Sequence, residues 1–344
     1  MFLTGGVVKT WYERAIQTLD ESAVAVKAQR AIPMRRLEAL ALDIVASLQE
    51  TDELVVEALS GPPGSPLLTN LVNVAILGSR VGIGLGYYGE ELQRLALAGL
   101  VHDIGLFAVP TQVLTKAGRL TPEERTLIEQ HPERGAEIML TCDSAFHWLA
   151  PLTCQAHERW NGQGYPRRLQ GRQIHEMAQI CGLVDVFDAL VSERPYRTRL
   201  FPHEAMKELL VTERATFPRE ILKALVEQLS VYPLGTTVRL TTEEVGVVVK
   251  INTRYPLRPV VKVIGSEQGR EPRELDLSLT PLIAVVETIK PPAAGQVELR
   301  KMLRRPPLSS TTTQVSDQFT SLLESLDAIA STLQEVIDVK KRHS

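Results

Sequence analysis

The chain has 344 residues, which is enough for two or three domains and a substantial core. Apolar residues make up 44% and charged residues 23%, ordinary globular values that argue against extended disorder. The net charge of −3 gives no general attraction to a nucleic-acid polymer or to an anionic membrane surface.

Cysteine content and hydropathy indicate the compartment. Cys142, Cys154 and Cys181 are too few, and odd in number, for a disulfide framework, which fits a reducing environment. We expect no membrane-spanning helix, because no run of about 20 uncharged apolar residues occurs. The first nine residues lack the features of a signal peptide. The sequence therefore predicts a cytoplasmic protein.

Residues 1–65 predict an N-terminal helical region. Between residues 35 and 59 the apolar side chains recur near the helical period. The segment Gly61-Pro-Pro-Gly-Ser-Pro66 then interrupts the pattern and marks a boundary.

Residues 66–231 predict a helical domain. The segments 68–85 and 90–104 are apolar on most faces, which is typical of interior helices. Thr121 and Pro122 predict the start of a further helix, with threonine as N-cap and proline in the first turn.

Short β-branched segments separated by turn residues replace the helical pattern after residue 231. They predict a small β subdomain over 232–290, followed by a polar linker over 291–313. The expected strands are 237–240, 245–251, 259–264 and 283–289.

A heptad pattern over residues 314–342 predicts a terminal amphipathic helix. Its apolar residues, from Val315 to Val336, are spaced alternately by four and three positions, as in a coiled-coil seam. Two interpretations stay open: a helix that docks on its own domain, or a coil over 315–336 that pairs with a second copy or a protein partner.

Five ionisable residues stand at the ends of apolar or Gly-rich segments. His102 and Asp103 end an apolar helix, His131 follows a charged one, His157 precedes a Gly-rich loop, and Asp185 lies in an apolar segment. Taken singly, each fits an ordinary capping or hydrogen-bonding role. Together, imidazoles and carboxylates suit Fe, Mn or Zn better than Mg or Ca, which prefer oxygen ligands.

The order of short motifs around these residues resembles the HD-GYP family of bacterial cyclic di-GMP phosphodiesterases, a branch of the HD superfamily of metal-dependent phosphohydrolases. The resemblance covers about residues 66–212. Its principal motifs are His102-Asp-Ile-Gly105, Gly118-Arg-Leu-Thr-Pro-Glu-Glu124, His131-Pro-Glu-Arg-Gly135, His157-Glu-Arg-Trp-Asn-Gly-Gln-Gly-Tyr-Pro166, Asp185-Val-Phe-Asp-Ala-Leu190 and Arg194-Pro-Tyr-Arg197.

The resemblance implies a mainly α HD-type helical bundle with metals at its centre and cyclic di-GMP as ligand. It also implies that Asp103 bridges two metals and is central to catalysis. Arginine side chains and a Gly-rich backbone suit phosphate binding. The implied metal ligands are His102, Asp103, His131, His157 and Asp185, and the implied substrate-binding residues are Gly164, Tyr165, Arg194 and Arg197.

Three positions depart from the family pattern. Asn70 stands where the family has its first histidine, Ala156 where it has one of two paired histidines, and Leu106 where it has a lysine. The resemblance therefore implies partial metal occupancy, or none, and weak or absent phosphodiesterase activity, with a role in binding the nucleotide or a partner. The alternative is an active enzyme that hydrolyses cyclic di-GMP to pGpG or GMP.

Two cysteines are candidates for substitute ligands. Cys154 precedes His157 by three residues and Cys181 precedes Asp185 by four, so each pair can share a helical face. The simpler interpretation is that both are small buried apolar residues.

Overall fold

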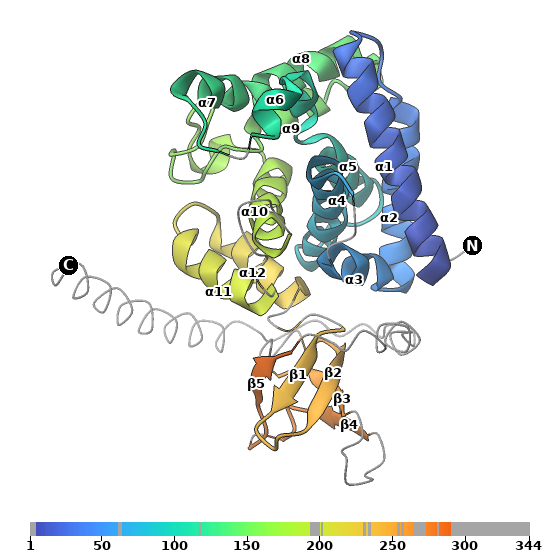
Figure 1. The fold of residues 1–344 in the computed structure, drawn as a ribbon, viewed down its shortest axis with the longest axis vertical. Helices are drawn as coiled ribbons and strands as arrows, with labels where there is room; N and C mark the ends of the chain where they lie inside the picture. Colours follow the sequence, from blue (N-terminus) through green and yellow to red (C-terminus); the bar gives the residue numbers. More distant parts are fainter. Residues whose placement is uncertain are drawn as a thin grey trace, which may run out of the picture. The chain divides into compact units, whose positions relative to one another are not determined.

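The computed structural model describes residues 5–60, 64–116, 118–192, 200, 202–229, 232, 235–252, 255, 258–263, 273–280 and 282–289. Helices account for nearly all regular structure up to residue 229, and a small antiparallel sheet follows (Figure 1). The expected fold class, mainly α with a small C-terminal sheet, is confirmed. The predicted linker over 291–313 and the heptad segment over 314–342 lie outside the described residues.

The N-terminal region is helical, as predicted, and the structure divides it into three helices. In the second, Leu37, Ile44 and Leu48 recur at helical spacing and are buried. This helix packs against α5 (Gly89–Val101) and α4 (Pro66–Gly84), and the first helix packs against α4 and against η1 (Ile104–Ala108). The bounds are α1 (Gly5–Lys27), α2 (Met34–Glu50) and α3 (Glu53–Ser60).

The centre of the helical part consists of α4 (Pro66–Gly84), α5 (Gly89–Val101) and α10 (Glu176–Val191), with α1 and α2 on its outer side (Figure 1). Helix α4 is long and apolar enough to cross a membrane, but 83% of its apolar 18-residue segment is buried inside the protein. Burial on nearly every face explains its uniform hydropathy, because an interior helix has no solvent-facing side.

Shorter helices connect α5 to α10. Thr121 and Glu124 form the predicted start of α7 as a capping box: the Thr121 hydroxyl accepts from the Glu124 backbone N–H at 3.2 Å, and the Glu124 carboxylate accepts from that of Thr121 at 2.8 Å. The bounds are η1 (Ile104–Ala108), α6 (Thr111–Leu114), α7 (Pro122–Glu129), α8 (His131–Thr141), η2 (Ser144–Phe146), α9 (Leu149–Gln155) and η3 (Gly171–Gln173).

Two further helices complete the helical part, α11 (Pro202–Thr212) and α12 (Arg219–Leu229). Helix α12 is amphipathic, with Ile221, Leu225 and Leu229 buried on one face. It packs against α4 and α10, while α11 packs against α10.

The sheet has the strand order β4-β3-β2-β1-β5, and every neighbouring pair is antiparallel. Four strands match the predicted segments. The fourth in sequence, Arg273-Glu-Leu-Asp276, was not predicted, because it is charged and has no β-branched residue. The bounds are β1 (Thr237–Leu240), β2 (Val245–Lys250), β3 (Val260–Val263), β4 (Arg273–Asp276) and β5 (Val285–Thr288).

Candidate metal centre

The fold brings the five predicted metal-ligand residues together, although they come from four separate parts of the fold. Backbone geometry places them at helix ends or inside α10, where side chains can converge without competing for the same helical face. His102 follows α5, Asp103 joins α5 to η1, His131 begins α8, His157 follows α9, and Asp185 lies on α10.

Asp103 is the centre of the cluster. Its Oδ1 atom lies 2.8 Å from Nε2 of His157, 3.1 Å from Nε2 of His131 and 3.6 Å from Nε2 of His102. All four side chains are buried. Three imidazoles around one buried carboxylate oxygen form a concentrated set of ligand atoms.

These atoms divide into two groups that share Asp103. Asp103, His131 and His157 form one, and His102, Asp103 and Asp185 form the other, each with its ligand atoms within 4.8 Å of one another. Each group could hold one divalent cation, and Asp103 would be shared between the two groups. The nitrogen and oxygen donors fit a divalent transition metal, but they do not identify it.

The orientation of the imidazoles also fits metal binding. Nδ1 of His102 lies 2.8 Å from the Gly99 carbonyl oxygen, and Nδ1 of His131 lies 2.7 Å from that of Ile128. Each Nδ1 therefore donates its proton to the backbone, which directs Nε2 towards Asp103. Nε2 of His102 is buried and has no hydrogen-bond partner among the described residues.

The charges in the cluster are mutually stabilising. Burial alone would raise the pKa of Asp103, but the neighbouring charges of His102, His157 and His131 hold it well below its usual range. Burial alone would lower the pKa of His131, yet the Asp103 carboxylate raises it. The contact between Nε2 of His131 and Oδ1 of Asp103 therefore stabilises both the carboxylate and the protonated imidazole.

Gly105 allows His131 to reach Asp103. A Cβ atom at position 105 would lie 1.9 Å from the His131 carbonyl oxygen and 2.7 Å from the Gly135 nitrogen. The backbones of η1 and α8 therefore approach more closely than any side chain at this position would allow. The glycine of the His-Asp-Ile-Gly motif thus positions His131, a predicted ligand on another helix.

Glu158 fixes the loop that follows His157. It is buried, and its carboxylate accepts hydrogen bonds from the backbone N–H groups of Arg167 at 2.7 Å and Leu169 at 2.9 Å. Gly164 folds back on the same residue: a Cβ atom there would lie 2.5 Å from the Glu158 Cα. Glu158 was not predicted as a functional residue, because it is part of the Glu-Arg-Trp motif but carries no metal-ligand signal.

Tyr165 forms one wall of the cluster. Its ring stacks on His157, with the centroids 5.1 Å apart and the planes 1° from parallel, and it meets His131 edge-on at 6.3 Å. Burial raises the pKa of the Tyr165 phenol, and the charges of Asp103 and Asp185 raise it further, so the hydroxyl stays protonated. Arg194 and Arg197, the other predicted substrate contacts, lie outside the described residues.

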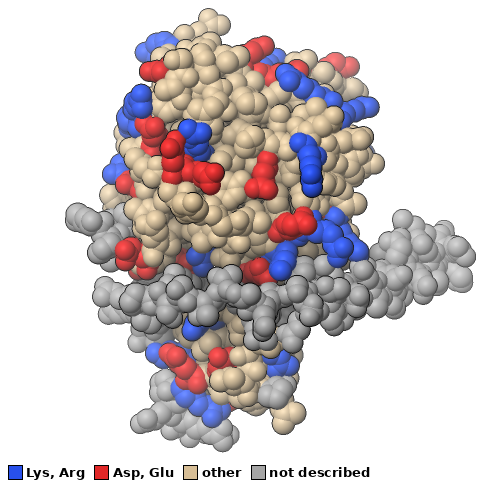
Figure 2. Space-filling view, turned by 180° about the vertical axis from the view of Figure 1, so that it is seen from behind, with Lys and Arg blue, Asp and Glu red and all other residues tan. Residues whose placement is uncertain are grey.

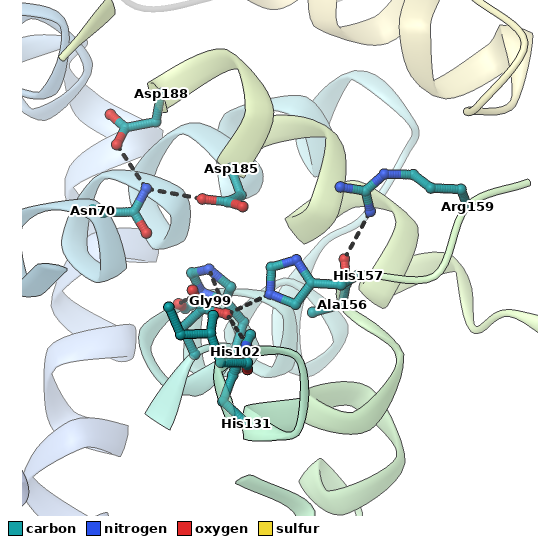
Figure 3. A network of polar contacts seen from close by, with 11 residues as sticks. Asn70, Gly99, His102, His131, Ala156, His157, Arg159, Asp185 and Asp188 are labelled. Carbon is teal, nitrogen blue, oxygen red and sulfur yellow. Dashed lines mark hydrogen bonds and ion pairs between the residues drawn. The ribbon is translucent and has the colours of Figure 1, made fainter. Parts of the chain in front are cut away.

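Asn70 lies beside the cluster but presents its nitrogen to it. Nδ2 donates to Oδ1 of Asp185 at 3.0 Å and to Oδ2 of Asp188 at 2.8 Å (Figure 3). Since a carboxylate oxygen accepts hydrogen bonds, this orientation of the amide follows from its partners. Asp188 was not predicted, although its spacing of three residues from Asp185 places both on one helical face.

Positions 156 and 106 offer no ligand or cation. Ala156 is buried, and its carbonyl oxygen accepts from Arg159 at 3.3 Å. Leu106 is half-buried in η1. Neither cysteine belongs to the two ligand groups. Cys154 and Cys181 are buried, and burial raises the pKa of the Cys181 thiol to about 12, as expected of the simpler interpretation.

Two family models match the chain. Residues 71–220 match the HD domain, and residues 237–296 match the KOW domain associated with HD domains. The first covers the predicted ligands, and the second begins at the first strand of the sheet.

Curated relatives carry the same region. A cyclic di-GMP phosphodiesterase of Pseudomonas aeruginosa is 36% identical over 181 residues, 53% of this chain and 44% of the relative. The cyclic di-GMP phosphodiesterase response regulator RpfG of Xanthomonas campestris is 30% identical over 230 residues, 64% of this chain and 60% of the relative. The chain thus spans about half the length of the curated relatives it matches.

A solved HD-GYP-type protein from Bdellovibrio bacteriovorus has a similar fold, with a TM-score of 0.50 at 18% identity over 64% of this chain and 69% of that protein. The two family models and the curated relatives confirm the predicted resemblance. The chain carries an HD domain over residues 71–220, followed by an HD-associated KOW domain over residues 237–296, and it is related to proteins named cyclic di-GMP phosphodiesterases.

Proposed function

We propose that this chain binds a cyclic dinucleotide, cyclic di-GMP first of all, at the Asp103 cluster and hydrolyses it slowly or not at all. The observation that carries the proposal is the combination of three imidazoles on Asp103 with an amide N–H at position 70. Relatives named for cyclic di-GMP support the choice of ligand, and a 3′3′-cGAMP-specific phosphodiesterase of Vibrio cholerae, 30% identical over 54% of this chain and 36% of its own length, supports the wider class.

The retained side chains would perform distinct tasks in the site. Bound Fe, Mn or Zn would supply an activated water and neutralise phosphate charge. Asp103 would join the two ligand groups, His131 and His157 would hold one side, and His102 and Asp185 the other. The Tyr165 hydroxyl, which stays protonated, would donate a hydrogen bond to a phosphate oxygen.

The three departures weaken this site in different ways. The Asn70 amide donates to Asp185, so its nitrogen competes with a cation for that carboxylate. Ala156 removes an imidazole, and Leu106 removes a positive charge that would face phosphate. The loss of a direct ligand should cost more than the roughly 10–100-fold in affinity that is typical of supporting residues.

An active phosphodiesterase is the alternative, because all five remaining ligand residues converge.

Residues 315–336 would bind a protein partner or a second copy of the chain in the cytoplasm. Acidic and basic side chains are mixed on the face shown in Figure 2, which offers a nucleic-acid polymer no extended basic surface there.

The test combines metal analysis with binding and hydrolysis of cyclic di-GMP in the presence of Fe(II) or Mn(II). We expect less than one metal per chain, measurable nucleotide binding and slow or absent turnover. Asp103→Ala should abolish metal binding. Asn70→His combined with Ala156→His should raise both metal content and turnover, because it returns two imidazoles to the cluster.

His147→Ala is the matched control, since His147 is half-buried and bonds the Cys142 carbonyl outside the cluster. It should change neither metal content nor nucleotide binding. Stoichiometric metal with rapid turnover that Asp103→Ala eliminates would establish the active alternative. If neither metal nor cyclic dinucleotide binds, the proposal fails.

A further inference from the structure

A continuous set of buried hydrogen bonds joins α1 to the Asp103 cluster. The Tyr12 hydroxyl donates to Oδ1 of Asn73, whose Nδ2 donates to Oδ1 of Asp188 at 2.7 Å. The other Asp188 oxygen accepts from Nδ2 of Asn70, which also donates to Asp185. Four side chains thus connect the N-terminal helix to the predicted metal ligand Asp185.

Chemistry fixes the direction of each bond in this series. Because the Asp188 carboxylate can only accept, both asparagines must turn their nitrogens towards it. The Asn73 oxygen then faces Tyr12, which must donate. Burial and the charges of Asp188 and Glu57 raise the pKa of Tyr12 well above its usual value, so the phenol keeps its proton.

The whole series is shielded from water. Tyr12 is 5% exposed, Asn73 0%, Asp188 1% and Asn70 8%. Water therefore cannot readily replace a lost hydrogen-bond partner. If one hydrogen bond of the series is removed, the remaining side chains must rearrange. Asn70 links Asp188 to Asp185, because its Nδ2 atom donates a hydrogen bond to each carboxylate (Figure 3).

Helix α1 also supports the other side of the cluster. It packs against α4, which carries Asn70, and against η1, which directly follows Asp103. Trp11 is buried beside Tyr12, with the two rings edge to face and their centroids 5.7 Å apart. The HD family match begins at residue 71, so α1 contributes from outside the matched domain.

We infer that Tyr12 is a positioning residue of the proposed cation site: acting through Asn73 and Asp188, it fixes the Asn70 amide and thereby the Asp185 carboxylate. This inference rests on the proposed cation site for its consequence, but the hydrogen-bonded series exists without a cation. The N-terminal helix α1 then helps to position the Asp185 carboxylate of the site. A change in the position of α1 would alter how Asp185 presents its oxygens.

The first experiment uses the metal-free, full-length protein. Tyr12→Phe removes one hydroxyl and keeps the ring that packs on Trp11. We expect it to shift the side-chain amide NMR signals of both Asn73 and Asn70 and to speed their hydrogen exchange. Tyr87→Phe is the control: it removes another tyrosine hydroxyl that donates a hydrogen bond, in this case to the Glu176 carboxylate at 2.6 Å, outside this series.

The second experiment measures Co(II) affinity and the visible spectrum of the cobalt-loaded protein. Tyr12→Phe should weaken Co(II) binding by about tenfold, the lower end of the range for residues that support a ligand, and should alter the spectrum. Asn73→Leu should do the same. Tyr12→Phe should then add nothing in the Asn73→Leu background, because the two residues act in one series.

The two experiments separate the failure of each idea. Unchanged Asn70 signals in Tyr12→Phe overturn the inference whether or not a metal binds. Co(II) binding that is identical in wild type and Tyr12→Phe, or additive effects of the two substitutions, also overturns it. Absence of Co(II) binding in wild type defeats the proposed cation site, and the NMR result still decides the series itself.

Discussion

Gly164 illustrates how one residue sets the geometry of the candidate site. A Cβ atom there would lie 2.4 Å from the Arg159 nitrogen and 2.5 Å from the His157 carbonyl oxygen. Both are backbone atoms, which cannot rotate away as a side chain can. The glycine therefore holds the loop against His157 and, with it, the stacked Tyr165 ring.

Gly164→Ala should displace this loop. We expect a loss of about 1–3 kcal/mol in the free energy of unfolding, the usual cost of forcing extra atoms into a packed region. Cyclic di-GMP binding should weaken at least about tenfold, because Tyr165 and His157 would separate. Urea unfolding and calorimetry measure the two effects.

Gly118→Ala is the control, since a Cβ atom at position 118 has no neighbour within 4 Å. Its effect on the free energy of unfolding should stay within about 0.5 kcal/mol. Wild-type nucleotide affinity in Gly164→Ala would show that the loop tolerates the added carbon.

At the scale of single elements, α7 is where local sequence decides most. The hydrogen bond from Lys116 and the backbone N–H of Thr121 lower the pKa of Glu124 below its usual value. A lowered pKa in the folded state means that ionised Glu124 stabilises the fold. This stabilisation is present above the unfolded-state pKa and is lost as the pH falls through the folded-state pKa.

Glu124→Gln tests that reasoning, because glutamine can keep the capping box but carries no charge. Its free energy of unfolding should fall below that of wild type near neutral pH. The difference should shrink towards zero as the pH falls through the lowered folded-state pKa of Glu124, because the wild-type carboxylate then becomes protonated. Urea titrations across this range give the comparison, and a difference that grows in acid would contradict it.

Helices and strands with a clear pattern in their own sequence were predicted. A strand that forms only because it pairs with a neighbouring strand was not. The capping box and the apolar pattern of α4 are local properties of the sequence. Strand β4, Arg273–Asp276, has no such signal and pairs with β3 through backbone hydrogen bonds, which any residue except proline can make. Its register against β3, not its composition, makes it a strand.

On the scale of the whole molecule, the N-terminal helices belong to the packing around the site. Trp11, Leu19 and Leu37 are among the largest fully buried side chains, and they belong to one core cluster with residues of α4 and α5. Removing these helices would expose apolar faces of α4 and α5 to water.

A chain that starts at residue 64 should therefore lose cooperative folding. We expect no sharp thermal transition by circular dichroism and increased binding of a hydrophobic dye. A chain that starts at residue 5 keeps α1 and should melt as the full-length protein does. A transition at the full-length temperature in the shorter chain would show that residues 66–231 fold without the N-terminal helices.

The sequence alone determined the helical class, the small sheet and the five ligand candidates, because helix periodicity, caps and motif spacing are encoded within short segments. Only the tertiary structure decided that those five side chains meet around Asp103, that Asn70 turns its nitrogen to Asp185, and that Tyr12 reaches the same network. Tyr12 and Asn73 are 61 positions apart and give no pattern together. Contacts of this kind depend on how helices pack, and packing is fixed by the whole core at once.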